Sequence, residues 1–187
     1  QCIPVFEMNV ASTGLTEKQC QDEKIDYRSV MVIPKDKVAL MPNAKPLYFK
    51  LVFAYPTGEI LGAQAVGESA VDKHVIAAMI TNHQYVEDLE SLELCYQPMF
   101  STAKNAVNMA GLVATNILND EYKQVNVSEV RSLVESGATI IDVREKFEYE
   151  AGHIKNAINI PMSEVRDRLD EIPTGRPVYV HCLSGQR

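Results

Sequence analysis

The sequence predicts two consecutive units of different fold class: an α+β unit over residues 1–121 and an α/β unit with a parallel sheet over residues 122–187. In the first unit, strand-like segments come early and most helical segments follow, which is typical of an α+β fold. In the second unit, short buried strands alternate with helices, which favours parallel βαβ units. The polar segment NDEYKQ separates the two patterns and places the boundary near Tyr122.

Composition narrows the class of protein before any motif is considered. With 46% hydrophobic and 23% charged residues, the 187-residue chain is globular. Its formal net charge of −7 argues against a nucleic acid or a membrane surface as the main partner. No apolar run approaches the ~20 residues that span a bilayer. The four cysteines form no Cys-x-x-Cys pair and have no metal-ligand spacing with the histidines. We therefore expect a cytoplasmic protein with free thiols and no metal site.

In the first unit the clearest strands are 46–54 and 60–66, joined by the turn Pro-Thr-Gly-Glu as a hairpin. Segments 4–13 and 27–33 are predicted to be one further strand each. A short helix is expected within 13–24, with Thr13 or Thr16 as its N-cap.

Three more helices are expected in the first unit. Apolar spacing predicts them over 69–84, with Ser69 as N-cap, over 86–95, and over 102–121. The last has an apolar stripe at Val107, Ala110, Val113, Ala114 and Ile117.

The second unit reads as alternating helices and strands. Helices are predicted over 127–137, stopped by Gly137, and over 163–172, capped by Ser163. Short strands are predicted at 139–143, 157–162 and 177–182.

The final segment, VYVHCLSGQR, has the chemistry of a nucleophile site. A strand delivers Cys182 to the start of a polar loop. Backbone N–H groups at such a turn stabilise a thiolate and lower its pKa. Gly185 allows the loop to curl, and Arg187 adds a cation able to bind an oxyanion. From the loop alone, a thiolate that attacks an anionic sulfur or phosphorus centre and a buried structural cysteine both remain open.

The segments IIDVREKFEYEAGHIKNAINIP and VYVHCLSGQR resemble the rhodanese family over about residues 124–187. Asp142 and Arg144 stand at its Asp-x-Arg signature, and CLSGQR matches its active-site loop with the Cys-x4-Arg spacing of sulfur transfer. The resemblance implies that Cys182 is the nucleophile that carries a persulfide sulfur. The cradle around it would be formed by Leu183, Ser184, Gly185, Gln186 and Arg187.

Two further expectations follow from the rhodanese resemblance. Asp142 and Arg144 would either contact substrate or, as the favoured role, fix the geometry of strand and loop. A rhodanese domain continues past its active-site loop with a helix and further elements. We therefore expect this truncated domain to be incomplete at its C-terminus.

The first unit resembles the C-terminal dimerisation domain of the flavin-dependent pyridine nucleotide–disulfide oxidoreductases, over roughly residues 4–120. The match runs through VFEMNVASTGLTEKQ, ILGAQAVG, VDKHVIAAM and LCYQPMFSTAKNAVNMAGLVATNIL, and is closest to the coenzyme A-disulfide reductase and NADH oxidase branch. In that branch an FAD domain and an NAD(P)H domain precede this one. The chain has no Gly-x-Gly-x-x-Gly motif, so we expect neither domain within these 187 residues and no FAD binding by them.

The resemblance also implies a homodimer through residues about 46–120. Tyr96 would reach the active site of the partner and hydrogen-bond a thiol or persulfide intermediate, with Phe100 and Lys104 at the same entrance. A plain interface role for Tyr96 is the alternative. Small residues on the helix from about 102 to 119 are expected to pack closely across the two-fold axis: Ala106, Ala110, Gly111 and Ala114.

Together the resemblances predict the C-terminal portion of an FAD-dependent NAD(P)H:disulfide or persulfide reductase whose rhodanese domain carries sulfane sulfur on Cys182. The substrate would be a persulfide, a polysulfide or coenzyme A disulfide. Leu40 and Met41 stand where the disulfide reductases have a tyrosine pair, which favours a persulfide or polysulfide. FAD and NAD(P)H would be the cofactors, coenzyme A a further ligand, and no metal is expected. An NADH oxidase or peroxidase, and a non-catalytic dimerisation module with an idle rhodanese-like domain, are the alternatives.

Overall fold

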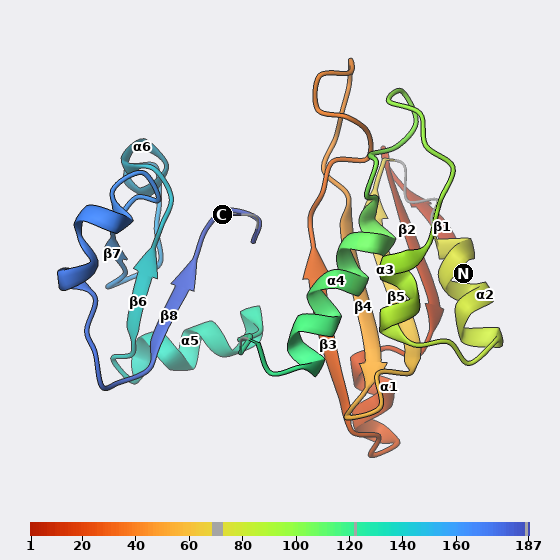
Figure 1. Ribbon diagram of the computed structural model, residues 1–187, viewed down its shortest axis with the longest axis horizontal. Helices are drawn as coiled ribbons and strands as arrows, with labels where there is room; N and C mark the ends of the chain where they lie inside the picture. Colours follow the sequence, from red (N-terminus) through yellow and green to blue (C-terminus); the bar gives the residue numbers. More distant parts are fainter. Residues whose placement is uncertain (69–72, 122, 186) are drawn as a thin grey trace. The chain divides into compact units, whose positions relative to one another are not determined.

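The computed structural model describes residues 1–68, 73–121, 123–185 and 187 and divides into two compact units (Figure 1). The units are Gln1–Lys123 and Gln124–Arg187, and each has its own sheet and its own core. The expected N-cap Ser69 and the boundary residue Tyr122 lie outside the described residues.

The first unit is built on a five-stranded antiparallel sheet with the strand order β1-β2-β5-β4-β3. Its strands are β1 (Cys2–Val5), β2 (Met8–Gly14), β3 (Tyr27–Val32), β4 (Tyr48–Ala54) and β5 (Ile60–Gly67). The predicted hairpin of β4 and β5 is confirmed. The single strand predicted over 4–13 is wrong, because the chain reverses at Phe6, whose φ of 54° lies in the left-handed region. The reversal carries no Gly, Asn or Asp, which are the residues that usually signal such a turn.

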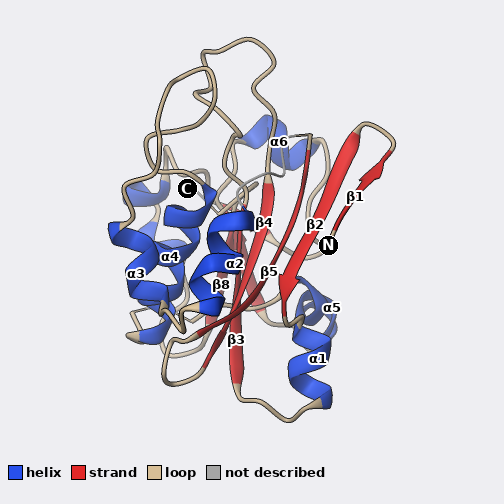
Figure 2. Ribbon diagram, turned by 90° about the vertical axis from the view of Figure 1, so that its right-hand side faces the viewer, coloured by secondary structure: helices blue, strands red, loops and turns tan. Residues whose placement is uncertain are grey.

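Within the described residues, four helices accompany this sheet: α1 (Glu17–Asp22), α2 (Lys73–Thr81), α3 (Val86–Ser91) and α4 (Ala106–Leu118). Three of them, α2, α3 and α4, lie on one side of the sheet, and α1 lies on the other (Figure 2). Thr16 caps α1 through a capping box with Gln19. The long helix begins later than predicted because the Asn105 side chain accepts the N–H groups of Val107 and Asn108.

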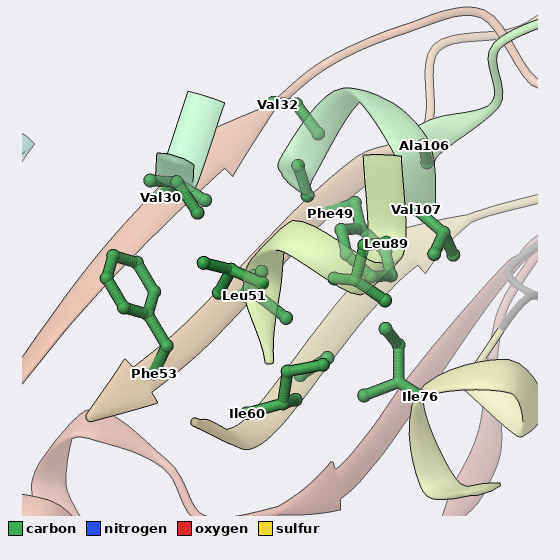
Figure 3. Packing of buried hydrophobic residues seen from close by; sticks show 14 of the residues in the cluster. Val30, Val32, Phe49, Leu51, Phe53, Ile60, Ile76, Leu89, Ala106 and Val107 are labelled. Carbon is green, nitrogen blue, oxygen red and sulfur yellow. The ribbon is translucent and has the colours of Figure 1, made fainter. Parts of the chain in front are cut away.

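The core of the first unit lies between the sheet and the three helices (Figure 3). Alternate residues of β3 and β4, such as Val30, Phe49 and Leu51, are buried and point towards the helices. They meet Leu89 of α3 and Val107 of α4. This is the expected match between the two-residue period of a strand and the apolar stripe of a helix.

The small residues of α4 belong to this core. A Cβ atom placed on Gly111 would lie 2.7 Å from the Cβ atom of Leu89, so the glycine permits the close contact of α4 with α3. Asn108 reinforces that contact by donating its side-chain N–H groups to the carbonyl oxygens of Leu89 and Leu92. The prediction that the small residues pack across a two-fold interface is therefore wrong, because all four are buried within their own unit: Ala106, Ala110, Gly111 and Ala114.

The second unit has a three-stranded parallel sheet with the strand order β7-β6-β8. Its strands are β6 (Thr139–Asp142), β7 (Ile158–Asn159) and β8 (Val178–His181), and its helices are α5 (Val127–Glu135) and α6 (Lys146–Glu150). Figure 1 shows β6 and β8 running side by side in the same direction. The expected stop after α5 is confirmed by Gly137, which has a φ of 73°. Helix α6 was not predicted, because it is only five residues long and its charged residues alternate with Phe147 and Tyr149, which is not a helical pattern.

The α-helix predicted over residues 163–172 is wrong. The segment forms two 3₁₀ turns, Val165–Asp167 and Leu169–Glu171. Arg168 between them has φ −123° and ψ 24°, outside the helical region, and this interrupts the run. The Arg168 guanidinium pairs with Glu164 on one side of the interruption and with Glu171 on the other. Ion pairs at this spacing often stabilise an α-helix, but in this segment they stabilise two separate 3₁₀ turns.

Asp142 organises the carboxyl edge of this sheet. In the strand register it lies directly beside Asn159 of β7 and His181 of β8. Its side chain is 0% exposed and accepts hydrogen bonds from the Arg144 backbone N–H and Nε, both at 3.0 Å, and from Nη2 at 2.6 Å. Arg144 also donates to the carbonyl oxygen of Gly152. Asn159 donates to the carbonyl oxygens of Asp142 and Arg144, which joins β7 to this group.

The charge state of Asp142 couples this network to pH. Burial alone raises the pKa of Asp142, but hydrogen bonds from Arg144 outweigh it and hold the pKa below its usual value. A carboxyl group with a lowered folded-state pKa stabilises the fold above its unfolded pKa of ~3.9. That contribution is lost as the pH falls through the lowered value.

We expect Asp142→Asn to lower the free energy of unfolding of the second unit by about 3 kcal/mol or more at neutral pH, because it leaves Arg144 without its carboxylate. The loss relative to the native protein should shrink as the pH falls below ~4. Urea unfolding at several pH values measures both effects. Asp170→Asn, at an exposed position of the same unit, should change stability by less than ~0.5 kcal/mol. A loss that is the same at every pH would contradict this account of the ion pair.

Candidate functional site

The candidate site lies at the carboxyl edge of the parallel sheet, where ligands bind in open α/β sheets. Strand β8 ends at His181, and Cys182 follows directly. The Cys182 Sγ atom accepts a hydrogen bond from the backbone N–H of Gly185 at 3.1 Å. Gly185 has a φ of 82°, a conformation that other residues rarely adopt. The loop therefore curls around the sulfur and directs a backbone donor at it, an arrangement that favours a thiolate.

Arg187 is held by a carboxylate on helix α6. Its Nη1 and Nη2 atoms donate to Oε2 and Oε1 of Glu148 at 2.6 Å and 2.7 Å. This two-point geometry is among the stronger hydrogen-bonded ion pairs in proteins. The pKa of Glu148 is lowered to about 2, chiefly by the hydrogen bond from Arg187, so Glu148 is ionised at neutral pH. The cation that the sequence predicts to bind an oxyanion thus has a carboxylate partner that no sequence pattern indicates.

Glu148 has a second task in the same helix. Its Oε2 atom accepts the backbone N–H of Glu145, the residue that caps α6, at 2.9 Å. The carboxylate therefore closes the first turn of α6 and pairs with the loop arginine at the same time. Nothing in the sequence singled out Glu148 from the neighbouring Glu145 and Glu150. A pairing between residues 39 positions apart becomes visible only in the fold.

The other predicted residues of the loop occupy different environments. Leu183 is exposed, Ser184 and Cys182 are half-buried, and Gln186 lies outside the described residues. His181 directs Nε2 to within 3.5 Å of an Asp142 oxygen without meeting hydrogen-bond geometry.

Asp142 and Arg144 are engaged with each other. Because the Asp142 side chain is fully buried, the geometry favours the role of fixing strand and loop over contact with substrate.

The residues predicted to reach a partner subunit lie in the segment between α3 and α4. Tyr96 is 51% exposed and Phe100 is 82% exposed. Such exposure is unusual for large aromatic side chains, which are mostly buried in folded proteins. The Nζ atom of Lys104 donates to the carbonyl oxygen of Glu90 at 2.9 Å and ties the segment to α3. These three residues lie on the segment that joins α3 to α4 in the first unit, and two of them are aromatic side chains open to solvent.

Neither a metal site nor a membrane span is found in the described part of the chain. Within residues 1–68, 73–121, 123–185 and 187, no group of three or more His, Cys, Asp or Glu residues could hold a metal ion. In the same ranges no helix is both long and apolar enough to cross a bilayer.

Two family models match the chain. Residues 2–107 match the pyridine nucleotide-disulphide oxidoreductase dimerisation domain. Residues 126–187 match the rhodanese-like domain. The first match covers more than half of the chain, and the two lie in the order that the sequence predicts.

Solved structures share both parts of the fold. The reduced CoADR-RHD protein of Bacillus anthracis is 42% identical with a TM-score of 0.93, and the match covers 97% of this chain and 33% of that one. An NAD-dependent persulfide reductase from A. fulgidus is 30% identical with a TM-score of 0.87, over 97% of this chain and 33% of that one.

A curated relative matches the first part of the chain. The coenzyme A disulfide reductase of Staphylococcus aureus strain bovine RF122 / ET3-1 is 29% identical over 114 residues, which is 60% of this chain and 26% of the relative. The chain therefore spans about a third of the length of the two solved structures and about a quarter of this relative. With these matches, the chain belongs to the pyridine nucleotide-disulphide oxidoreductases through its dimerisation domain, and this domain is followed by a rhodanese-like domain.

Proposed function

We propose that this chain is part of an FAD-dependent NAD(P)H:disulfide or persulfide reductase, in which Cys182 carries sulfane sulfur. The observation that carries the proposal is the position of Cys182 at the carboxyl edge of the sheet, with the N–H of Gly185 directed at its sulfur. Similarity to a persulfide reductase over nearly the whole chain supports it. In the same proposal, residues 1–121 form the dimerisation domain and residues 122–187 form the rhodanese-like domain. The candidate site residues of each unit belong to the site of that domain.

The transfer step needs only groups that the loop can supply. The Cys182 thiolate attacks the outer sulfur of a persulfide, R–S–SH, and a new S–S bond forms to Sγ. The S–S bond of the donor breaks, and its electron pair leaves with the thiolate R–S⁻. The outer sulfur keeps its proton or loses it to solvent, so no oxidant or reductant takes part. The backbone N–H of Gly185 stabilises the charge on Sγ before attack and on the resulting persulfide.

The reductive part of the reaction would use FAD and NAD(P)H, which the remainder of such a protein binds. No glycine-rich phosphate loop occurs in this sequence, so we expect the dinucleotide phosphates to be bound by the remainder of the protein. Coenzyme A is a candidate carrier of the persulfide or disulfide. Four cysteines that form no disulfide bond suit a reducing cytoplasmic setting. An NADH oxidase or peroxidase and an idle module remain the alternatives, but neither gives Cys182 a task.

Cys182→Ser should abolish sulfur transfer from a persulfide donor, because a serine hydroxyl stays protonated and cannot carry the sulfur. Cys95→Ser, at an exposed cysteine of the first unit, should leave the transfer rate unchanged. Mass spectrometry of the protein after exposure to the donor measures the added sulfur directly. Retained transfer in the Cys182 variant, or no transfer in the native protein, would contradict the proposed role of Cys182.

We further propose a homodimer through residues about 46–120, in which the segment around Tyr96 and Phe100 faces the partner subunit. Tyr96 would hydrogen-bond the thiol or persulfide intermediate there, with Lys104 at the same entrance. Exposure of both aromatic side chains supports this surface. The small residues of α4 take no part in it, because they are buried in the core.

We expect the native chain to sediment as a dimer at tens of micromolar and Phe100→Glu to weaken the dimer about tenfold or more, because it places a charge in the contact. Phe6→Glu provides a matched control, since Phe6 is fully exposed in the same unit but lies outside residues 46–120. Sedimentation velocity over a concentration series measures both variants. A monomeric native chain, or an equal loss in the two variants, would contradict this interface.

A further inference from the structure

The charges around the Cys182 loop do not form a positive pocket. Both terminal nitrogen atoms of Arg187 are occupied by Glu148, at 2.6 Å and 2.7 Å. The Arg187 and Glu148 side chains are 31% and 18% exposed, so water reaches this pair and part of the attraction between the two charges is screened. An arginine whose charge is met by a carboxylate at hydrogen-bond distance exerts little net attraction on an incoming anion.

The neighbouring charges reinforce this effect. Arg187 interacts with Glu145 as well as Glu148, and Glu148 interacts with Arg144 as well as Arg187. Arg144 in turn is paired with the buried Asp142. These three carboxylates and two guanidinium groups have a formal balance of −1 before the Cys182 thiolate forms. Formation of the thiolate adds a further negative charge to the site.

We propose that Glu148 is a positioning residue that neutralises Arg187 and makes the Cys182 loop select sulfur donors of low charge, namely alkyl persulfides, over doubly charged oxyanion donors such as thiosulfate. This inference rests on the proposed sulfur transfer from persulfides and adds the residue that disfavours doubly charged donors. It changes the role expected for Arg187, which becomes a structural partner of α6 in place of an oxyanion clamp.

The two donor classes place different charge in the site. A neutral persulfide R–S–SH gives its outer sulfur to Cys182 and releases R–S⁻, so the reactants carry one negative charge in total. Thiosulfate gives its outer sulfur to Cys182 and releases sulfite, SO₃²⁻, so the reactants carry three. Each reaction forms one S–S bond to Sγ and breaks one S–S bond in the donor. Only the second must concentrate a dianion beside Glu148 and Glu145.

Alkylation of Cys182 by two reagents of nearly equal size tests the charge effect without any sulfur transfer. Iodoacetate is an anion and iodoacetamide is neutral, so the ratio of their rates reports the potential at Sγ. Glu148→Gln should raise the iodoacetate-to-iodoacetamide ratio about threefold or more, because it removes one negative charge and leaves Arg187 without its carboxylate. Glutamine at this position retains the acceptor that closes the first turn of α6. Peptide mass spectrometry separates Cys182 from the other cysteines.

Glu150→Gln is the matched control. It removes the same charge from the same helix, but Glu150 is exposed and lies 3.9 Å from Lys146. Its effect on the ratio should be less than half that of Glu148→Gln. An unchanged ratio in Glu148→Gln, or equal effects of the two variants, would overturn the proposal.

Sulfur transfer in the full natural protein gives the second readout. Glu148→Gln should raise kcat/KM for thiosulfate by a larger factor than kcat/KM for the persulfide of a small neutral thiol. An equal change for both donors would overturn the donor selectivity. If no donor transfers sulfur to the native protein, the proposed function fails, and the alkylation ratio still decides whether Glu148 sets the potential at Cys182.

Discussion

The ion pair between the buried carboxylate of Asp142 and Arg144 holds the second unit in the form that presents Cys182. Asp142 lies at the carboxyl end of the central strand, beside Asn159 on one neighbour and His181 on the other. A buried, unpaired carboxylate is costly, so its hydrogen bonds from Arg144 are required for the fold to keep this charge. Because the ends of the three strands are fixed, Cys182, which directly follows His181, lies at the carboxyl edge of the sheet.

At that edge, stabilisation of the thiolate and control of charge are performed by different groups. The backbone N–H of Gly185 contacts the sulfur, whereas the guanidinium of Arg187 is turned to Glu148 on α6. Backbone donors are neutral and fixed by the fold, so they stabilise a thiolate or persulfide without attracting dianions. This separation fits a domain that exchanges sulfur with persulfides. The reductive chemistry would belong to the flavin-dependent part of the proposed enzyme.

The sequence was informative where local signals and long-range structure agree. The hairpin of β4 and β5, the stripe of α4 and the strand that leads to Cys182 all follow from periodicity and turn residues. The turn at Phe6 carries no such signal, and the break at Arg168 interrupts a pattern that reads as a helix. Residue size alone could not tell whether Gly111 packs against Leu89 or against a partner. The pairing of Glu148 with Arg187 depends on the fold, because three glutamates in the same segment were equally plausible.

The central claim is that the loop at the carboxyl edge holds Cys182 as a thiolate through the backbone N–H of Gly185. The most direct test is the pH dependence of Cys182 alkylation by iodoacetamide in the full natural protein, followed by peptide mass spectrometry. The account predicts an apparent pKa clearly below the ~8.5 of a free cysteine, so that the thiolate is populated at neutral pH. An apparent pKa at or above that value would contradict it.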